Sequence, residues 1–325
     1  MKTLIAEDDL VSRRLLEASL SKWGYEVIVA GDGAAAWSIL EQDDAPRLAL
    51  LDWMMPELDG VEICKRVRRR EGRPYVYIVL LTAKSEKQDL LKALDAGADE
   101  YLTKPFDAEE LQARLHGGRR ILELQDELIA AREALRYQAT HDALTGVYSR
   151  GEILNVLRRE AERSRRRQLS LGLVLADLDH FKMVNDTYGH LTGDAALRES
   201  ASRMESAVRA YDVVGRYGGE EFLIVVPASD EAGTLALAER IRQSITNRPI
   251  AAPAGEIFVT ASLGVAVSGG TEGIEPEALL HAADIALYRA KQAGRNRSEL
   301  ANPADLVATP SSSVADATTL KTEPP

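Results

Sequence analysis

Five short apolar runs alternate with amphipathic segments across the first 120 residues, and this alternation is the strongest constraint on the fold. The runs cover residues 3–6, 26–30, 48–52, 75–83 and 100–103. Repeated units of this kind predict a parallel β-sheet covered by helices on both faces. Because such sheets place their sites at the carboxyl ends of the strands, one edge of this α/β domain is the place to look for chemistry.

Acidic and basic side chains follow the predicted strands. Glu7 and Asp8 follow the first strand, and Asp52 ends the third. Carboxylates that converge at one edge disfavour joint ionisation unless a cation joins them, and Mg²⁺ prefers oxygen ligands. Together with Lys104 after the fifth strand, such a metal would hold a phosphoryl group while a carboxylate attacks it, giving an aspartyl phosphate. Single acids are common in loops after strands, but this ordered combination is far more specific.

Residues 1 to about 118 resemble the receiver domain of bacterial response regulators. The motifs "IAEDD", "LLDWMMPELDG", "LLTA" and "EYLTKPF" match that family in order and spacing. The resemblance implies a flavodoxin-like fold, a bound Mg²⁺ and a cognate histidine kinase as partner. Glu7 stands where Asp is commoner in the family, and its extra methylene should still allow metal binding, directly or through water. The implied roles are phosphoacceptor for Asp52, Mg²⁺ ligands for Glu7, Asp8 and Asp52, phosphate contact for Lys104, switch hydroxyl for Thr82 and switch aromatic for Tyr101.

Residues 120–139 have a different pattern. Apolar residues recur there in alternating steps of three and four, at Ile121, Leu124, Leu128, Ala131 and Leu135. This spacing is the seam of a coiled coil and favours a helical linker that dimerises. A surface helix packed on its own domain is the alternative, because the run is short.

Composition limits the class of protein. The chain has 325 residues, enough for two domains, and a net charge of -11, which argues against nonspecific nucleic-acid binding. No apolar stretch is long enough to span a membrane, and the acidic start "MKTLIAEDDL" is unlike a signal peptide. Cys64 is the single cysteine, so no intrachain disulfide forms and we expect a cytoplasmic protein.

Residues 140–300 mix helix and strand patterns. Strands are predicted at 169–179, 213–217, 222–227 and 258–267. A tight turn joins the second and third of these strands, so the sheet is at least partly antiparallel. We therefore expect a receiver domain at 1–119, a coiled-coil linker at 120–139, an α+β domain at 140–300 and a polar, disordered tail at 301–325.

The stretch "RYGGEEFLIVVP" places two glutamates where a strand begins. Gly218 and Gly219 form a turn signal, because glycine reaches positive φ without steric cost and lets a bulky anion approach the backbone. Neighbouring strand residues point to opposite faces, so Glu220 and Glu221 cannot both be buried on one side. At a hairpin tip they could converge on a ligand across the turn, or they could form an ordinary exposed acidic turn.

A second set of polar residues lies nearby in sequence. Asp177 and Asp179 end the apolar strand before "HFKMVNDTYGHLTGD", and Asp177 could share metal ions with Glu220. Asn185 and Asp194 together could recognise a guanine edge, since the carboxylate accepts from ring N–H and amino groups. The candidate phosphate contacts are Lys182, Lys291 and Arg295.

Residues 140–300 resemble the GGDEF domain, the diguanylate cyclase family. "HDALTGVYSR", "DLDHFKMVNDTYGH", "GGEEF" and "ADIALYRAKQAGRN" match its motifs, with Ser149 where Asn is usual. The resemblance implies a palm-like fold and synthesis of cyclic di-GMP and pyrophosphate from two GTP by two facing domains of a homodimer. It implies Mg²⁺ ligation by Asp177, Glu220 and the backbone carbonyl of Leu178, and contact of Glu221 with the nucleotide. The remaining implied GTP-binding residues are Phe181, Lys182, Asn185, Asp194, Gly218, Gly219, Lys291 and Arg295.

Arg209 and Asp212 form an R-x-x-D motif just before the hairpin. Its spacing matches the product-inhibition site of the family, where cyclic di-GMP would bind with Arg240 as a second arginine. Two other functions stay open: an inactive receptor that binds cyclic di-GMP through this motif, and a related cyclase that uses ATP. The intact carboxylates disfavour the first, and Asp194 disfavours the second, because adenine lacks the ring N–H donor.

Overall fold

The computed structural model describes residues 1–83, 87–269 and 275–307. The chain forms two compact units, Met1–Glu133 and Ala134–Pro325, and the division falls within helix α5 (Ala108–Thr140). Each unit is described by itself. In the part of the chain that is described, no helix has both the length and the apolar composition needed to cross a bilayer.

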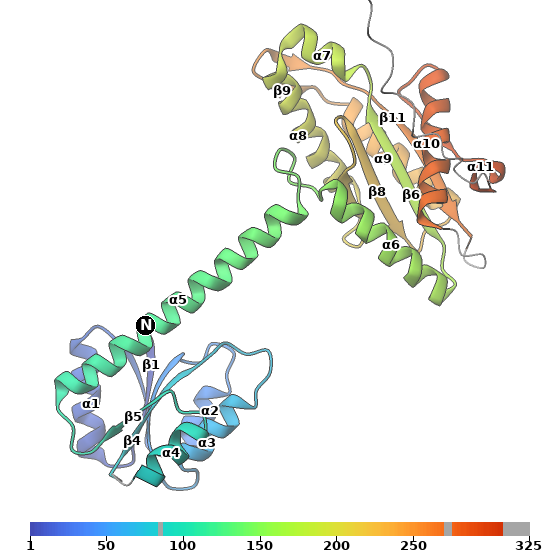
Figure 1. Ribbon diagram of the computed structural model, residues 1–325. Helices are drawn as coiled ribbons and strands as arrows, with labels where there is room; N and C mark the ends of the chain where they lie inside the picture. The colour runs from blue at the N-terminus through green and yellow to red at the C-terminus, as the bar shows by residue number, and fades with distance from the viewer. Residues whose placement is uncertain (84–86, 270–274, 308–325) are drawn as a thin grey trace, which may run out of the picture. The chain divides into compact units, whose positions relative to one another are not determined.

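The first unit contains a five-stranded parallel sheet in the order β2-β1-β3-β4-β5 (Figure 1). Its strands are β1 (Lys2–Ala6), β2 (Glu26–Ala30), β3 (Leu48–Asp52), β4 (Tyr77–Thr82) and β5 (Glu100–Thr103). The predicted flavodoxin-like fold is confirmed. Because β1 and β3 are neighbours, Glu7 and Asp52 leave the sheet side by side.

Helices cover both faces of this sheet (Figure 1). They are α1 (Leu10–Lys22), α2 (Gly33–Leu40), α3 (Gly60–Arg68), α4 (Lys87–Asp95) and the first part of α5. Leu16, Leu20, Leu111 and Leu115 of α1 and α5 pack on one face, whereas α2, α3 and α4 pack on the other. The central strands β1, β3 and β4 are buried on both sides, which explains their continuous apolar sequences, whereas the edge strands β2 and β5 are only partly buried.

Helix α5 is continuous for 33 residues, so no break separates the expected linker from the receiver. The helix continues through Gly118, where a Cβ atom would come within 2.5 Å of the Tyr77 ring, so glycine allows α5 to pack closely on the sheet. Leu122 is fully buried in the core of the first unit, while Leu124 and Leu128 are 53% and 69% exposed. The seam predicted for a coiled coil is thus exposed along a helix that begins inside the receiver.

The second unit contains a mixed five-stranded sheet in the order β12-β11-β6-β8-β7 (Figure 1). Its strands are β6 (Leu171–Leu178), β7 (Val213–Arg216), β8 (Glu221–Pro227), β11 (Ala261–Ser268) and β12 (Ser298–Leu300). The predicted hairpin is β7–β8, and the central strands pair in antiparallel fashion while β12 runs parallel to β11. The α+β prediction is confirmed. The sequence patterns did not reveal β12 or the small hairpin of β9 (Ile250–Ala252) and β10 (Gly255–Ile257).

Two helical layers enclose this mixed sheet. One face packs against α7 (Phe181–Tyr188), α8 (His190–Ala207) and α9 (Glu231–Thr246). The other face packs against α6 (Arg150–Arg167) and α10 (Pro276–Gln292). Central strand β6 is buried along its whole length and carries Asp177 at its carboxyl end.

The predicted disordered tail needs a correction at its start. Ala301 is buried, and α11 (Pro303–Val307) follows it, held by an ion pair between Arg289 and Asp305 of 2.9 Å. The polar composition of this stretch concealed the anchor, because a single buried side chain and one ion pair create no periodic pattern. Residues 308–325 lie outside the described residues.

Candidate functional site

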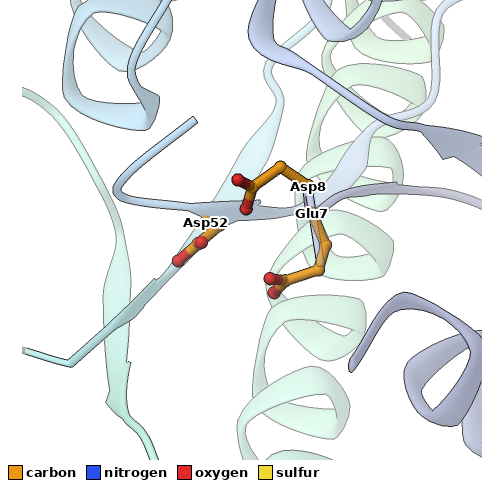
Figure 2. A group of neighbouring side chains, drawn as sticks. All are labelled: Glu7, Asp8 and Asp52. Carbon is orange, nitrogen blue, oxygen red and sulfur yellow. The ribbon is translucent and has the colours of Figure 1, made fainter. Parts of the chain in front are cut away.

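The acidic side chains at the end of the parallel sheet form one compact group. Oxygen atoms of Glu7, Asp8 and Asp52 all lie within 4.8 Å of one another. Figure 2 shows the three carboxylates around a common space, with Glu7 and Asp8 following β1 and Asp52 at the end of β3. This all-oxygen set of donors fits a hard cation such as Mg²⁺.

Lys104 lies against the same group. Its Nζ is 2.7 Å from a Glu7 carboxylate oxygen and 3.1 Å from Asp52 Oδ1. Burial opposes the charge on Lys104, but the hydrogen bonds to the two carboxylates raise its pKa. Burial also raises the pKa of Glu7, against the effect of the Lys104 hydrogen bond. The structure thus brings together the residues expected to hold a phosphoryl group on Asp52.

The two expected switch residues lie on the neighbouring strands. Thr82 is the last residue of β4 and is fully buried. Its carbonyl accepts a hydrogen bond of 2.7 Å from the backbone N–H of Lys104. Tyr101 lies in β5 and packs, partly buried, against the core on the α2–α4 side.

In the second unit, three carboxylates lie where β6 ends and β8 begins, namely Asp177, Glu220 and Glu221. Asp177 is the direct cross-strand partner of Glu221, and Glu220 immediately precedes β8. The Leu178 N–H donates a hydrogen bond of 3.3 Å to the Glu220 carbonyl. Leu178, whose own carbonyl is the expected metal ligand, therefore lies beside the hairpin tip. Lys291 of α10 places its Nζ 2.8 Å from Asp177 Oδ2.

Burial and mutual repulsion perturb these acids. Burial raises the pKa of Asp177, Glu220 and Glu221, and the charge of Asp177 raises the pKa of both glutamates further. Lys291 opposes the shift at each of the three. One lysine does not balance three carboxylates, so a divalent cation at this site would relieve the repulsion. Among the described residues, only Glu7, Asp8 and Asp52 have carboxylate oxygens that all lie within 4.8 Å of one another. The carboxylates of Asp177, Glu220 and Glu221 are therefore spaced more widely than those of the first unit.

The two glycines of the hairpin have different surroundings. The N–H groups of Tyr217 and Gly218 both donate to the Glu221 carbonyl, at 2.8 and 3.2 Å. A Cβ atom on Gly218 would meet a Glu221 carboxylate oxygen at 2.5 Å, whereas Gly219 faces open space. Neither glycine has the positive φ that we expected from a tight turn. A larger residue at 218 would therefore displace the Glu221 carboxylate from its present position.

Helices α7 and α8 bring the expected guanine-binding residues together. A Cβ atom on Gly193 would lie 1.9 Å from Asn185 Oδ1 and 3.2 Å from Phe181 Cζ. The Asn185 amide therefore lies directly over Gly193, next to half-buried Asp194, with the buried ring of Phe181 beside it. An amide and a carboxylate on adjoining helices fit the polar edge of a base.

The expected phosphate contacts have different settings. Lys291 pairs with Asp177, as described above, while Lys182 lies exposed on the first turn of α7. Arg295 lies exposed just after α10 with a φ of 61°. Burial raises the pKa of Asp177, and the charge of Arg295 opposes that shift. Of the three, Lys291 forms the ion pair with this acidic group.

The R-x-x-D motif forms a tight turn beside a pocket. Asp212 Oδ2 accepts a hydrogen bond of 2.9 Å from the Arg209 backbone N–H, and Arg209 donates to the Tyr211 hydroxyl at 2.9 Å. Asp212 Oδ1 is buried without a hydrogen-bond partner. Both motif residues line a pocket of about 380 Å³. Arg240 lines a different pocket and donates to the Ala207 carbonyl at 2.7 Å, so the structure does not place it with the other two.

One functional contact was missed by sequence reasoning. Arg216 forms an ion pair with Asp142 at 3.0 Å and donates to the Gly219 carbonyl at 2.7 Å. It thereby ties the hairpin tip to the segment that follows α5. Asp142 lies in the quoted motif "HDALTGVYSR", which is a signal for its importance, but its partner is 74 residues away and no local spacing connects them.

Comparison with known proteins defines the class. The family model of the response regulator receiver domain matches residues 3–116. The model described as diguanylate cyclase, GGDEF domain, matches residues 139–297. The chain therefore belongs to the response regulators that carry a GGDEF domain.

Individual relatives agree with this class. The chain is 34% identical over 251 residues to the response regulator PleD of Caulobacter vibrioides, covering 77% of this chain and 55% of PleD. It is 40% identical over 169 residues to the diguanylate cyclase DosC of Escherichia coli, covering 52% of this chain and 36% of DosC. The chain thus spans less than two thirds of the length of these curated relatives. It also matches the crystal structure of the coiled coil and GGDEF domain of DgcB from Caulobacter crescentus in complex with c-di-GMP, with a TM-score of 0.52 and 30% identity, over 59% of this chain and 99% of that one.

Proposed function

We propose that this chain is a diguanylate cyclase that makes cyclic di-GMP from two GTP and releases pyrophosphate. The observation that carries the proposal is the arrangement of Asp177, Glu220 and Glu221 around the hairpin tip, with Lys291 2.8 Å from Asp177. Asn185 and Asp194, on the adjoining helices α7 and α8, add candidate contacts for guanine. The relatives named as diguanylate cyclases support the same activity.

Each group has a proposed role in the reaction. Asp177, Glu220 and the Leu178 carbonyl would hold Mg²⁺, which neutralises phosphate charge when bound. Lys182, Lys291 and Arg295 would bind the triphosphate, and Gly218 and Gly219 would let it approach the backbone. The 3′-oxygen of each GTP attacks the α-phosphorus of the other, so two phosphodiester bonds form and the bonds to two leaving pyrophosphates break. The raised pKa of Glu221 suits a group that accepts the proton of this hydroxyl.

Product analysis tests the activity directly. Purified protein is incubated with GTP and Mg²⁺, and nucleotide products are separated, with ATP and Mg²⁺ in a parallel reaction. We expect cyclic di-GMP from GTP and no cyclic dinucleotide from ATP, because guanine offers Asp194 both a ring N–H and an amino group, whereas adenine has no N1–H. An inactive receptor would bind cyclic di-GMP but consume no GTP. Turnover of ATP would instead contradict the guanine assignment.

The receiver is proposed to control this output. A cognate histidine kinase would supply the phosphoryl group, and Asp52 would accept it beside Glu7, Asp8 and Mg²⁺. Lys104, already 3.1 Å from Asp52, would then contact the phosphoryl oxygens. The Thr82 hydroxyl on β4 would contact the phosphoryl group, and the Tyr101 side chain on β5 would change its rotamer in response.

Activity is proposed to require a homodimer, because one GGDEF domain supplies half of the site. We propose that the two chains associate through the seam of α5, because Leu124 and Leu128 are exposed apolar residues at coiled-coil spacing. In this proposal residues 1–119 receive the signal, residues 120–139 transmit it and residues 140–300 catalyse.

Charged residues in the seam should uncouple assembly from phosphorylation. In Leu124→Asp/Leu128→Asp we expect the phosphodonor-dependent rise in dimer to disappear and activity at low protein concentration to fall about tenfold, because four aspartates, two from each helix, would lie in the seam. Light scattering alongside turnover measures both. Ile129→Asp is the matched control, since Ile129 is 48% exposed but lies off the seam. Equal losses in the control would argue against the seam.

The R-x-x-D turn is proposed to be the site of product inhibition. The buried, unpartnered Asp212 Oδ1 suits a guanine N–H, and the Arg209 guanidinium suits a guanine or phosphate. Arg240 would join it only after moving from its contact with the Ala207 carbonyl.

Loss of the motif arginine should relieve inhibition. In Arg209→Ala we expect the inhibition constant for cyclic di-GMP to rise at least about tenfold with an unchanged initial rate, because a charge-assisted contact is lost. Titration of cyclic di-GMP into an initial-rate assay measures this. Arg198→Ala, at an exposed position on α8, is the control. An unchanged inhibition curve in Arg209→Ala would exclude the motif as the inhibitory site.

A further inference from the structure

Asp179 is a buried carboxylate with no role in the site described so far. It lies two residues after Asp177 and is 5% exposed. Its Oδ1 accepts from the Ser262 hydroxyl at 2.7 Å, and its Oδ2 accepts from the Thr260 hydroxyl at 2.6 Å. The same Oδ2 accepts from the Asn296 backbone N–H at 3.1 Å. Both oxygens of Asp179 therefore accept hydrogen bonds from neutral groups of the protein, whereas Asp177 Oδ2 forms an ion pair with Lys291.

The bond to Asn296 holds an unusual turn. Arg295 and Asn296 both have left-handed backbones, with φ of 61° and 47°. Consecutive non-glycine residues in this region are disfavoured and persist only where the surroundings determine them. Here the Arg295 N–H donates to the Ala290 carbonyl at 3.0 Å, and Asn296 Oδ1 accepts from Arg242 at 2.7 Å. Asp179 adds the bond that connects this turn to the end of β6.

We infer that Asp179 is a positioning residue for the triphosphate, acting through Arg295. The turn that Asp179 holds carries Arg295 at its apex, and the charge of Arg295 already acts on Asp177. Asp179 thus connects the strand that carries the metal-binding carboxylate to the loop that carries a phosphate-binding guanidinium. The inference rests on the proposed function, because it assumes that Arg295 contacts GTP.

A double-mutant cycle tests the connection. Asp179→Ala, Arg295→Ala and the double variant are assayed for KM and kcat with GTP. We expect each single variant to raise KM about tenfold with kcat changed less than about threefold, because a contact of the bound triphosphate is lost. Since Asp179 acts through Arg295, the double variant should match Arg295→Ala. Multiplicative effects in the double variant would overturn the inference.

Hydrogen exchange provides a readout that does not depend on turnover. The Asn296 amide should exchange at least about tenfold faster in Asp179→Ala than in the wild type, because its acceptor is gone. If the wild type makes no product but this change is seen, the proposed function fails while the structural link stands. Unchanged exchange at Asn296 would overturn the link itself.

Two further variants separate positioning from general loosening. Ser262→Ala removes the bond to Oδ1 from an equally buried position and leaves the bond to Asn296. We expect an unchanged KM for this variant, and a rise equal to that of Asp179→Ala would overturn the inference. If Asp179→Ala does not fold, Asp179→Asn keeps the volume and one acceptor. We expect a rise of about threefold for it, absent in the Arg295→Ala background.

Discussion

Glu220→Gln is expected to lower cyclic di-GMP synthesis about 10³-fold while the fold is retained. Glu220 precedes β8 at the hairpin tip. Burial raises its pKa, and the negative charge of Asp177 raises it further. Glutamine keeps the size of the side chain but removes the anionic ligand that Mg²⁺ requires. Initial rates with saturating GTP, measured across Mg²⁺ concentrations, test the loss.

The same substitution should stabilise the metal-free protein at neutral pH. Burial and Asp177 raise the pKa of Glu220, so its ionised form is disfavoured in the folded state. The penalty is absent below the unfolded pKa of about 4.5 and fully present above the folded pKa. We therefore expect Tm of Glu220→Gln to exceed that of wild type by about 1–3 °C at pH 7 without Mg²⁺, and the difference to vanish near pH 4.

Glu256→Gln is the matched control for both measurements. Glu256 is exposed in β10, away from the hairpin tip, so its replacement should change neither turnover nor Tm. Near-wild-type synthesis by Glu220→Gln would remove this residue from the metal site. A lower Tm at pH 7 would contradict the electrostatic argument even if activity were lost.

Asp52→Asn is expected to abolish the response to phosphorylation. We expect a small-molecule phosphodonor to raise both dimer population and specific activity of the wild type about tenfold, within the range of ordinary allosteric coupling. Phosphorylation would place new acceptor oxygens beside Lys104, whose Nζ is 3.1 Å from Asp52 Oδ1. A modification shifts such an equilibrium only by its different effect on the two states. Asparagine forms no acyl phosphate, so neither response should remain.

Light scattering and turnover, measured across protein concentrations, test both responses together. Asp44→Asn is the control, because the Asp44 side chain is 77% exposed and pairs with Lys2. A phosphodonor response in Asp52→Asn equal to that of wild type would exclude Asp52 as the phosphoacceptor. Activity per molecule that is independent of concentration in a monomeric sample would exclude control through assembly.

Local patterns in the sequence predicted most of the architecture. Alternating apolar runs and amphipathic segments indicated the parallel sheet, because burial on both faces leaves continuous apolar strands. The hairpin of β7 and β8 was likewise predictable from two β-rich runs around Gly218 and Gly219. Strand ends share an edge in a parallel sheet, so the meeting of Glu7, Asp8 and Asp52 also followed from the sequence.

The helix patterns were less complete. The apolar seam of α5 was visible, but its continuity with the receiver was not, because a glycine pair at 117–118 normally weakens a helix. Only the packed structure reveals that Gly118 is required by the Tyr77 ring. Residues 301–307 likewise resembled the start of a polar, disordered tail. Only the structure reveals that Ala301 is buried and that Asp305 forms an ion pair with Arg289.

The sequence by itself determined which residue types are present at the strand ends, because side-chain period and turn chemistry are local properties. Only the tertiary structure decided the partners: Arg216 with Asp142, Asp177 with Lys291, and Asp179 with the Asn296 amide. These pairs are separated by 74 to 117 residues. Such contacts depend on where strands and helices meet in space, and no spacing along the chain encodes them.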